Sequence, residues 1–330
     1  MTATTTATMN AVAYHRYGAP DVVAIERVPR PAAGEHDVIV RVRAATVGAA
    51  DSAARAGSPF FARLFFGPLR PRLPVLGSDF AGVVEEVGAS VTRWAVGDEV
   101  IGVTSASLGS HAEYVRVSDD GAMVRKPRRF GFEDAASLAE LTALPFLRDA
   151  GRVTAGTRLL VNGASGSVGA SAVQLAKHLG AHVTAVCSGA NIDLVRSLGA
   201  DEVIDYTVAD FTAGTARYDV VFDAVGMSSF ARCRRILTAT GSYLGTVPSL
   251  GLLMRTAFAE RARGRRAVIL LTGLRPTPAQ LADLEQIVGL AELGAVVPVV
   301  DSTYPASRAA EAHARVDSGR KRGNVILTFP

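Results

Sequence analysis

The chain has 330 residues, which at roughly 150 residues per domain predicts two domains. Hydrophobic residues make up 48% of the chain and charged residues 20%, a globular composition that excludes a disordered or collagen-like protein. The formal net charge is only +4, and the densest basic cluster, Arg261, Arg263, Arg265 and Arg266, contains no interleaved aromatic residues. We therefore interpret this cluster as solvated surface and expect no nucleic-acid partner.

The sequence contains neither a membrane-spanning segment nor a secretory signal. Its apolar runs, such as Ala267–Leu271, are far shorter than the roughly 18 residues of a transmembrane helix. Residues 1–9 lack a basic start and an apolar stretch, so they predict a flexible leader rather than a signal peptide. Two cysteines, Cys187 and Cys233, are too few for a disulfide framework, which favours a cytoplasmic protein without a membrane partner.

The first 125 residues are rich in short strands. Val/Ile-rich runs separated by Gly, Pro and Asp turn signals predict strands at Ala11–Tyr14, Val38–Arg43, Gly82–Val87 and Glu99–Val103. Between the second and third run lies Phe60–Leu73, which is aromatic and broken by prolines. Its rings either line a substrate cleft or pack a loop onto the core.

From about Thr157 the pattern changes to alternating strands and helices, which predicts a parallel sheet built from right-handed crossovers. The predicted strands are Arg158–Asn162, His182–Val186, Asp219–Phe222, Ser242–Gly245 and Ala267–Leu271, and the predicted helices are Ser167–Leu179, Ala190–Leu198 and Phe230–Leu237. After Pro276 we expect a helix at Ala279–Leu293, a strand at Val296–Val300, a helix at Ala306–Val316 and a strand at Asn324–Phe329.

The segment between the first of these strands and its helix has the spacing of a nucleotide-binding loop. A glycine at 166 lets the backbone approach a pyrophosphate, and a glycine at 169 lets the helix pack close to its strand. The helix N-terminus adds N–H donors and the positive end of a dipole. The predicted cofactor-binding residues of this loop are Gly163, Ala164, Ser165, Gly166, Ser167, Val168 and Gly169. A hydrolase nucleophile elbow is excluded, because Ser167 stands where its last glycine would be.

The end of the second strand predicts which dinucleotide binds. NAD enzymes usually place Asp or Glu there, where it binds the ribose 2′-hydroxyl. The run Val183–Asn191 contains no acid, while Ser188 and Asn191 can donate hydrogen bonds, so the sequence favours NADPH as the cofactor. The same two side chains can also cap the second helix, and the two roles are compatible.

Several spaced motifs carry a family resemblance. They are PVLGSDFAGVVEEVGASVTRWAVGDEVIG from Pro74, NGASGSVGASAVQLAKHLGAHVTAVCS and SLGADEVIDYT, flanked by YHRYGAPDVVAIE and GNVILTF. Together they resemble the medium-chain dehydrogenase/reductase superfamily, and more narrowly its zinc-independent quinone oxidoreductase-like branch. The resemblance implies an α/β fold with a GroES-like β-barrel catalytic domain, residues 1–127 and 276–330, and an inserted Rossmann doubly wound parallel-sheet domain, residues 128–275. It also implies a homodimer.

The resemblance also bears on metal binding. Zinc-dependent relatives have a cysteine just ahead of the position of Asp51, and a Gly-His-Glu where this chain has Gly77-Ser78-Asp79. Their four-cysteine lobe after Gly-Asp is missing here, since Gly97-Asp98 continues directly into the next strand. We therefore expect no metal site.

Further cofactor contacts follow from the resemblance, residue by residue. Thr142 would lie by the nicotinamide and Tyr206 near the adenine, while Val225 and Gly245 would line the cofactor groove at strand ends. Asn324, which stands where relatives often have a lysine, completes the predicted set.

The chemistry implied by the resemblance is hydride transfer from NADPH to a small apolar quinone or α,β-unsaturated carbonyl. Tyr17 is the one proton donor that we name, although a packed or surface tyrosine is the simpler interpretation. Close relatives often carry Asn-Pro-x-Asp where this chain has Gly48-Ala49-Ala50-Asp51, so a polar side chain is missing near the reacting centre. Two alternatives therefore stay open: a zinc-free alcohol/aldehyde oxidoreductase, and a non-catalytic NADPH-binding sensor or partner protein.

Overall fold

A computed structural model describes residues 7–60, 63–258 and 264–330 of the chain. Contacts between Cα atoms divide it into two compact units. Unit 1 comprises Met1–Ala139, Leu274–Glu292 and Pro298–Pro330, and unit 2 comprises Glu140–Gly273 and Leu293–Val297. The chain thus leaves unit 1, builds most of unit 2, returns to unit 1 for Leu274–Glu292, and passes once more through unit 2 before it ends in unit 1. The domain boundaries given above, after residues 127 and 275, stay predictions.

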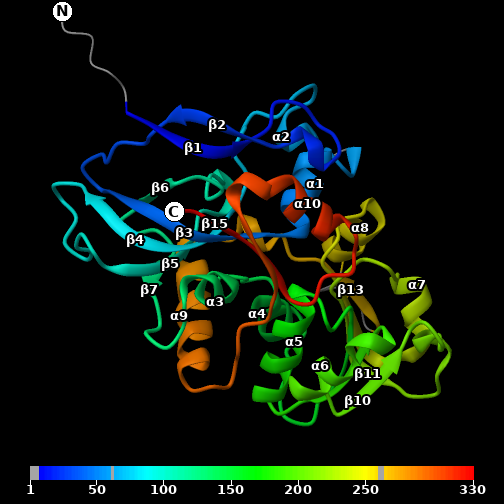
Figure 1. The fold of residues 1–330 in the computed structure, drawn as a ribbon. Coiled ribbons are helices and arrows are strands. Elements are labelled where there is room, and N and C mark those ends of the chain that lie inside the picture. The colour runs from blue at the N-terminus through cyan, green and yellow to red at the C-terminus, as the bar shows by residue number, and fades with distance from the viewer. Residues whose placement is uncertain (1–6, 61–62, 259–263) are drawn as a thin grey trace, which may run out of the picture. The chain divides into compact units, whose positions relative to one another are not determined.

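Within the described residues, unit 1 contains a seven-stranded sheet and a separate antiparallel strand pair (Figure 1). The sheet order is β14 (Val300–Pro305), β15 (Asn324–Thr328), β3 (Asp37–Val47), β4 (Asp79–Val87), β5 (Glu99–Val103) and β7 (Met123–Arg125), with β6 (Tyr114–Ser118) paired to β3. The separate pair is β1 (Thr8–Ala13) and β2 (Ala24–Pro29). Neighbouring strands of the sheet run antiparallel, except for β14 and β15, which are parallel.

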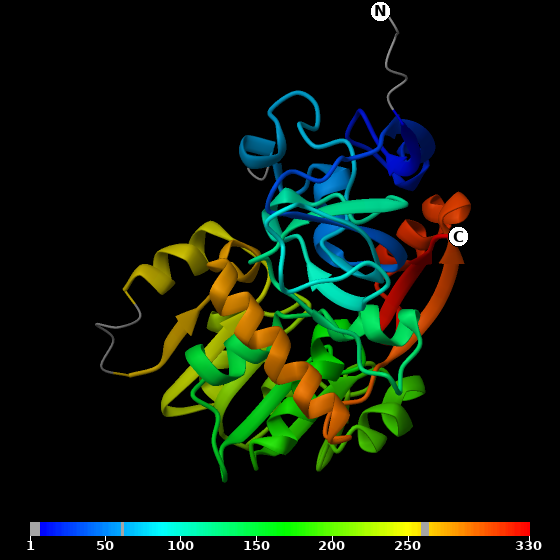
Figure 2. The same cartoon turned by 90° about the vertical axis from the view of Figure 1, so that its left-hand side faces the viewer.

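The helices of unit 1 surround this sheet. They are α1 (Ala49–Ala56), α2 (Arg63–Phe66), α3 (Phe132–Leu138), α9 (Thr277–Glu292) and α10 (Ala309–Asp317). The long α9 lies beside α3, as Figures 1 and 2 both show. The core forms on one face of β3, where Val38, Val40 and Val42 alternate with residues of the other face and pack with residues of β4, β15 and α10.

Unit 2 is built, in the part of the chain that the structure describes, around a six-stranded parallel sheet. Its order is β10 (Glu202–Asp205), β9 (His182–Cys187), β8 (Arg158–Asn162), β11 (Tyr218–Asp223), β12 (Leu237–Gly245) and β13 (Arg266–Val268). Its helices are α4 (Ala143–Pro145), α5 (Ser167–His178), α6 (Ile192–Ser197), α7 (Phe230–Cys233) and α8 (Leu250–Ala257). The first strand lies in the middle of the sheet and the order reverses beside it. This arrangement confirms the predicted α/β fold with a doubly wound Rossmann sheet.

The parallel register brings the carboxyl ends of four strands to one edge of this sheet, which we call the carboxyl edge. Asn162 of β8 pairs with Val186 of β9 and with Asp223 of β11, and Asp223 pairs with Gly245 of β12. Ligands of doubly wound folds bind outside this edge, where the strand order reverses. We therefore expect the candidate ligand site at this carboxyl edge.

Several predicted elements need correction. The leader over residues 1–9 is too long, because Thr8 and Met9 pair with Pro29 and Val28 as part of β1; residues 1–6 lie outside the described residues. The strand predicted at Val296–Val300 is wrong: β14 begins only at Val300, and Pro298 has no N–H to give to a sheet. The helix predicted to reach Leu237 ends earlier, because Leu237 pairs with Tyr218 in the sheet.

The three described ranges contain no helix that is both long and apolar enough to span a membrane.

Candidate nucleotide-binding site

The loop between β8 and α5 is held by close contacts of its own backbone. Gly163 has a φ of 81°, in the left-handed region, and its N–H and that of Ala164 donate to the Val186 carbonyl at 3.1 and 3.0 Å. A Cβ on Gly169 would lie 2.1 Å from the Gly163 oxygen, and a Cβ on Gly163 would lie 2.4 Å from Cγ1 of Val225. These two glycines are therefore required by the protein's own packing.

Gly166 is different, because no protein atom fills the space beside it. Its φ of −78° suits any residue, and a Cβ there would meet only the Gly163 oxygen, at 3.4 Å. Gly166 is also the N-cap of α5 and supplies no side chain to the first turn of that helix. A helix N-terminus offers N–H groups and a positive dipole end, so the open space beside Gly166 fits a phosphate group.

Asn191 connects this loop to the end of β9. Its Nδ2 donates to the hydroxyls of Ser165 and Ser188 at 2.9 and 3.2 Å. Its Oδ1 is buried and has no hydrogen-bond partner within the described ranges. Such an orphaned acceptor costs about 1–3 kcal/mol, so a ligand that donates to it would be stabilised. Rotating the amide would instead present the NH₂ group to a phosphate. The residues present thus fit a dinucleotide.

An acid lies beside this position, although it comes from another strand. Asp205, the last residue of β10, pairs with Cys187, and a Cβ on Gly189 would lie 2.6 Å from its Oδ2. Its Oδ1 accepts from the backbone N–H and the hydroxyl of Thr207 at 2.8 and 2.7 Å. These hydrogen bonds from Thr207 lower the pKa of Asp205, which keeps it charged. Asp205 lies outside the run Val183–Asn191, so the sequence of that run alone does not reveal this acid.

A buried carboxylate, Asp223, fixes the carboxyl edge between β8 and β12. Its Oδ1 accepts from Asn162 Nδ2 at 2.9 Å and from the backbone of Gly226 at 3.0 Å, and more weakly from that of Val225 at 3.3 Å. Its Oδ2 accepts from the Tyr243 hydroxyl at 2.8 Å and from the backbone of Ser228 at 2.9 Å. The carboxylate therefore holds the loop whose Val225 contacts Gly163. Sequence reasoning missed Asp223, although its place at the end of a predicted strand was a usable signal.

The other residues predicted in unit 2 have these positions. Thr142 precedes α4, and its N–H donates to Oε1 of Glu140 at 2.8 Å. Tyr206 is exposed and its N–H donates to the Cys187 carbonyl at 3.1 Å. Gly245 ends β12 at the carboxyl edge. The structure thus brings the loop glycines, Ser188, Asn191 and the strand-end residues to one edge of one sheet.

Two predicted site residues belong to unit 1. The Tyr17 hydroxyl donates to the Gly67 carbonyl at 2.6 Å, its ring lies 4.6 Å from the Arg63 guanidinium carbon, and burial raises its pKa. Asn324 is buried at the start of β15, where its N–H donates to the Val299 carbonyl at 2.8 Å. The hydrogen bond to Gly67 makes Tyr17 part of the local packing.

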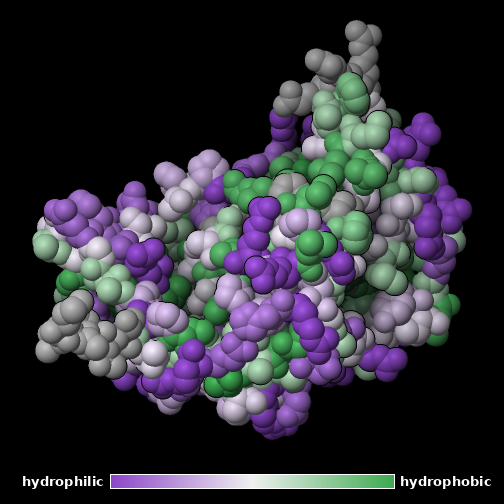
Figure 3. Space-filling model, turned by 90° about the horizontal axis from the view of Figure 1, so that it is seen from above, coloured by the Kyte–Doolittle hydropathy of each residue, from purple (hydrophilic) through white to green (hydrophobic). Residues whose placement is uncertain are grey.

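Both units expose apolar side chains. In unit 1 these include Phe60, Leu64 and Leu69, with 76, 71 and 92% of their surface exposed; residues 61–62 of the aromatic stretch lie outside the described residues. In unit 2 they include Leu250 and Met254 on α8. Figure 3 shows hydrophobic patches among hydrophilic ones on the face seen from above. Exposed patches of this kind are typical of surfaces that bind apolar ligands.

Two carboxylates near the positions of the relatives' zinc ligands form hydrogen bonds within the chain. Both oxygens of Asp51 accept backbone N–H groups, from Gly77 at 3.0 Å and from Gly48 at 2.8 Å. Asp79 accepts from the hydroxyls of Ser78 and Thr46 at 2.6 and 2.8 Å. Where the structure describes the chain, no three His, Cys, Asp or Glu side chains gather as a metal ion would require.

Comparisons with known proteins define the class. Residues 34–141 match the family described as "Alcohol dehydrogenase GroES-like domain", and residues 198–327 match that described as "Zinc-binding dehydrogenase". The chain is 33% identical to the "Chloroplast envelope quinone oxidoreductase homolog" of Arabidopsis thaliana, over 97% of this chain and 98% of the relative. It is also 33% identical to the "NADPH-dependent alkenal/one oxidoreductase, chloroplastic" of the same plant, over 97% of this chain and 79% of the relative.

A solved structure agrees with these sequence matches. The quinone oxidoreductase from Coxiella burnetii superposes with a TM-score of 0.87 at 29% identity, covering 98% of this chain and 100% of the other. The chain therefore belongs to the medium-chain dehydrogenase/reductase superfamily, with a GroES-like unit and a Rossmann unit. Within this superfamily it belongs to the quinone oxidoreductase-like branch.

Proposed function

We propose that this protein is an NADPH-dependent, zinc-independent oxidoreductase that reduces quinones or α,β-unsaturated carbonyls. The observation that carries the proposal is the open space beside Gly166, at the N-terminus of α5 and on the carboxyl edge of a Rossmann sheet. When bound there, NADPH supplies the hydride. The chain's own part is to hold the phosphates at this loop and to position the rest of the cofactor along the carboxyl edge.

The choice of NADPH rests on Ser188 and Asn191. Both are polar side chains at the end of β9, and Asn191 can turn its NH₂ group toward a 2′-phosphate. Asp205 acts in the opposite direction, because its negative charge repels a phosphate. We expect NADPH to bind more tightly than NADH, with a preference that the Asp205 charge reduces.

The acceptor class is supported by two observations. The relatives with the names given above include a quinone oxidoreductase homolog and an alkenal/one oxidoreductase. Within unit 2, the exposed Leu250 and Met254 of α8 suit a small apolar substrate better than a charged one.

The first experiment measures cofactor binding and oxidation with matched glycine variants. Gly166→Ala leaves the packing of the loop intact but places a methyl group in the open space, so we expect the Kd for NADPH to rise at least about tenfold. Gly289→Ala is the control, because a Cβ there meets nothing within 4 Å. Isothermal titration gives the Kd, and absorbance of NADPH gives turnover with a panel of quinones and enones.

The outcomes separate the alternatives. Tight NADPH binding without turnover of any acceptor would favour the sensor or partner protein, and alcohol-dependent reduction of NADP⁺ would favour the alcohol/aldehyde oxidoreductase. Absence of NADPH binding would overturn the proposal.

The proton donor is tested separately. We propose Tyr17 for this role, which requires its hydroxyl to leave the Gly67 carbonyl. Tyr17→Phe should then lower kcat at least about tenfold with the Kd for NADPH unchanged. An unchanged kcat would assign the proton to solvent. The homodimer and the cytoplasmic location stay predictions; light scattering of the purified protein tests the first.

A further inference from the structure

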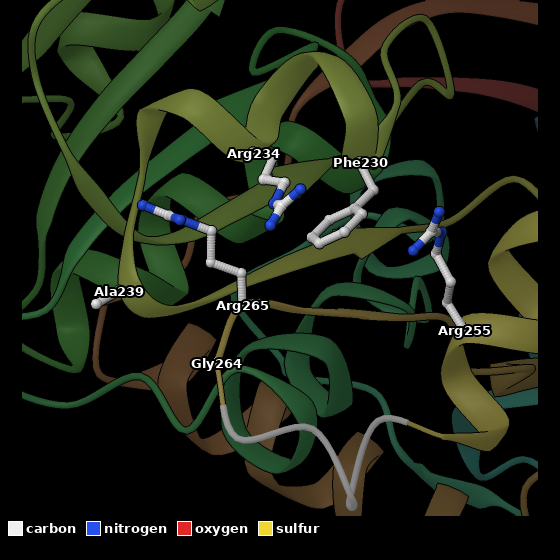
Figure 4. A pocket seen from close by; sticks show the side chains of 6 residues that line it. All are labelled: Phe230, Arg234, Ala239, Arg255, Gly264 and Arg265. Carbon is white, nitrogen blue, oxygen red and sulfur yellow. The ribbon is translucent and has the colours of Figure 1, made fainter.

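Unit 2 contains a cavity with a volume of about 430 Å³. It is lined by Phe230, Arg234, Ala239, Arg255, Gly264 and Arg265 (Figure 4). It lies near the start of β12, where Leu237 pairs with Tyr218, whereas the carboxyl edge lies at the other end, where Gly245 pairs with Asp223. Asp223 lies five positions along the strand from Tyr218, a length of roughly 17 Å. The cavity is therefore distinct from the nucleotide loop.

The walls of this cavity are fixed by contacts within unit 2. The register of β11 and β12 shifts between Tyr218 and Val220, so residues 238–241 leave the regular ladder and expose Ala239. Nε and Nη2 of Arg265 both donate to the Leu237 carbonyl, at 3.1 and 3.0 Å. The guanidinium carbon of Arg255 lies 5.1 Å from the centre of the Phe230 ring. In the view of Figure 4 that ring lies between the guanidinium groups of Arg234 and Arg255.

The described residues that line the cavity carry a positive charge that no acid among them balances. Its six lining residues include three arginines and no acid. In the described part of the chain, Arg234, Arg255 and Arg265 form no ion pair with a carboxylate, whereas the nearby Arg232 and Arg235 both lie within 4.0 Å of Asp210, at 3.4 and 3.9 Å. Gathering like charges without a counter-ion is unfavourable, and a bound anion would relieve the repulsion.

We propose that this cavity is a second ligand site, which binds a small molecule carrying two or more phosphate groups. A guanidinium group forms paired hydrogen bonds with phosphate oxygens, so Arg234 and Arg255, on either side of the Phe230 ring, can each hold one phosphate of the same ligand. The volume lies within the range of small-molecule sites, and a concave hollow suits a compact ligand better than a nucleic-acid strand. Phe230 serves to hold Arg255 in place, so the ligand needs no aromatic base.

The test titrates inorganic tripolyphosphate into protein saturated with NADP⁺, so that the phosphate loop is already occupied. Isothermal titration should detect one further equivalent per chain, with an affinity that falls as salt is raised. Arg234→Gln and Arg255→Gln should each weaken this binding at least about tenfold. Arg232→Gln is the matched control, since Arg232 is exposed close by but pairs with Asp210, and it should change the affinity less than about twofold.

Three outcomes overturn the proposal of a second ligand site. If NADP⁺ abolishes tripolyphosphate binding, the anion uses only the nucleotide loop. If Arg232→Gln weakens binding as much as Arg255→Gln, the effect is diffuse surface charge. If Arg255→Gln changes the oligomer and no tripolyphosphate binds, the cavity belongs to an interface between two copies of the chain. Failure of NADP⁺ itself to bind would instead count against the proposed function, and the arginine dependence would still decide the cavity.

Discussion

Asp223 in unit 2 and His313 in unit 1 are both completely buried, and the protein accommodates them in opposite ways. Asp223 receives hydrogen bonds at both carboxylate oxygens, from two side chains and from the loop after β11. Neither ring nitrogen of His313 has a hydrogen-bond partner among the described residues. The carboxylate is held because donors replace its water, whereas the imidazole is tolerated in its neutral form.

The surroundings of His313 explain its neutral state. Its ring meets that of His111 nearly edge-on, with centroids 6.1 Å apart and an angle of 78° between the planes. Burial above all, and then His111 and the buried Arg55, lower the pKa of His313 to about 3. A buried group with donors therefore fixes local geometry, while a buried group without them makes stability depend on pH.

The largest expected effect comes from removing the carboxylate of Asp223. Asp223→Ala leaves Asn162, Tyr243 and three backbone N–H groups without their acceptor, so we expect unfolding to become easier by about 3–5 kcal/mol. Urea unfolding measures this. Asp219→Asn, at the other end of β11 and only half-buried, is the control and should cost less than about 1 kcal/mol. A loss below that of the control would show that the donors find other partners.

The second largest expected effect is a loss of folding stability at low pH that depends on His313. The unfolded chain binds a proton near the ordinary pKa of 6.5, whereas the folded chain does so only near 3, so stability is complete above about 6.5 and is lost as the pH falls. Below pH 6.5 the free energy of unfolding falls by about 1.4 kcal/mol per pH unit, which gives a loss of about 2 kcal/mol at pH 5. His313→Leu should remove this part of the acid sensitivity in urea unfolding at pH 7.5, 6 and 5. His178→Gln, at an exposed histidine, is the control and should leave the acid sensitivity unchanged.

The Rossmann half could be predicted from sequence because its signals are local. The strand Arg158–Asn162 and the start of α5 at Ser167 were predicted at the residues where they occur, from one apolar run followed by spaced glycines. In unit 1, α1 was missed. Its buried face carries polar side chains, Asp51 and Arg55 among them, where an apolar stripe is expected, and Arg55 is anchored to Asp317, 262 residues away. A helix anchored by such a distant partner leaves no pattern in its own sequence.

In the candidate site, too, some features have local signals in the sequence and others depend on distant residues. The glycine loop could be predicted because its three glycines lie within seven residues of chain, and the close approach of Gly169 to the Gly163 carbonyl is itself local. The hydrogen bonds of Asp223 could not be predicted, because its side-chain donors come from Asn162 and Tyr243, 61 and 20 residues away, and only the parallel register brings them together. Asp205 was missed for the same reason, since it reaches the end of β9 from the neighbouring strand.

A milder substitution tests one hydrogen bond of Asp223, the bond from the Tyr243 hydroxyl. Tyr243→Phe removes one donor while the others remain, so we expect a loss of about 1.5 kcal/mol in urea unfolding. Burial, and then Asp223, raise the pKa of Tyr243, so its hydroxyl stays a donor at neutral pH. Tyr218→Phe, on the neighbouring strand and without a bond to Asp223, should be close to neutral. Equal losses in both variants would mean that tyrosine packing, and not the bond to Asp223, carries the effect.

The smallest expected effect is on cofactor choice, at a carboxylate that has donors but is not buried. Asp205 accepts from Thr207 as Asp223 accepts from its neighbours, yet it lies near the protein surface, so Asp205→Asn should leave the urea midpoint unchanged. Because its charge repels a 2′-phosphate, the variant should shift the ratio of the Kd values for NADH and NADPH toward NADPH by roughly two- to fivefold. Asp120→Asn, at an exposed carboxylate of unit 1, controls for net charge. A shift toward NADH would contradict the placement of Asp205 beside the 2′-position, whereas a shift toward NADPH would make Asp205 the residue that limits the preference.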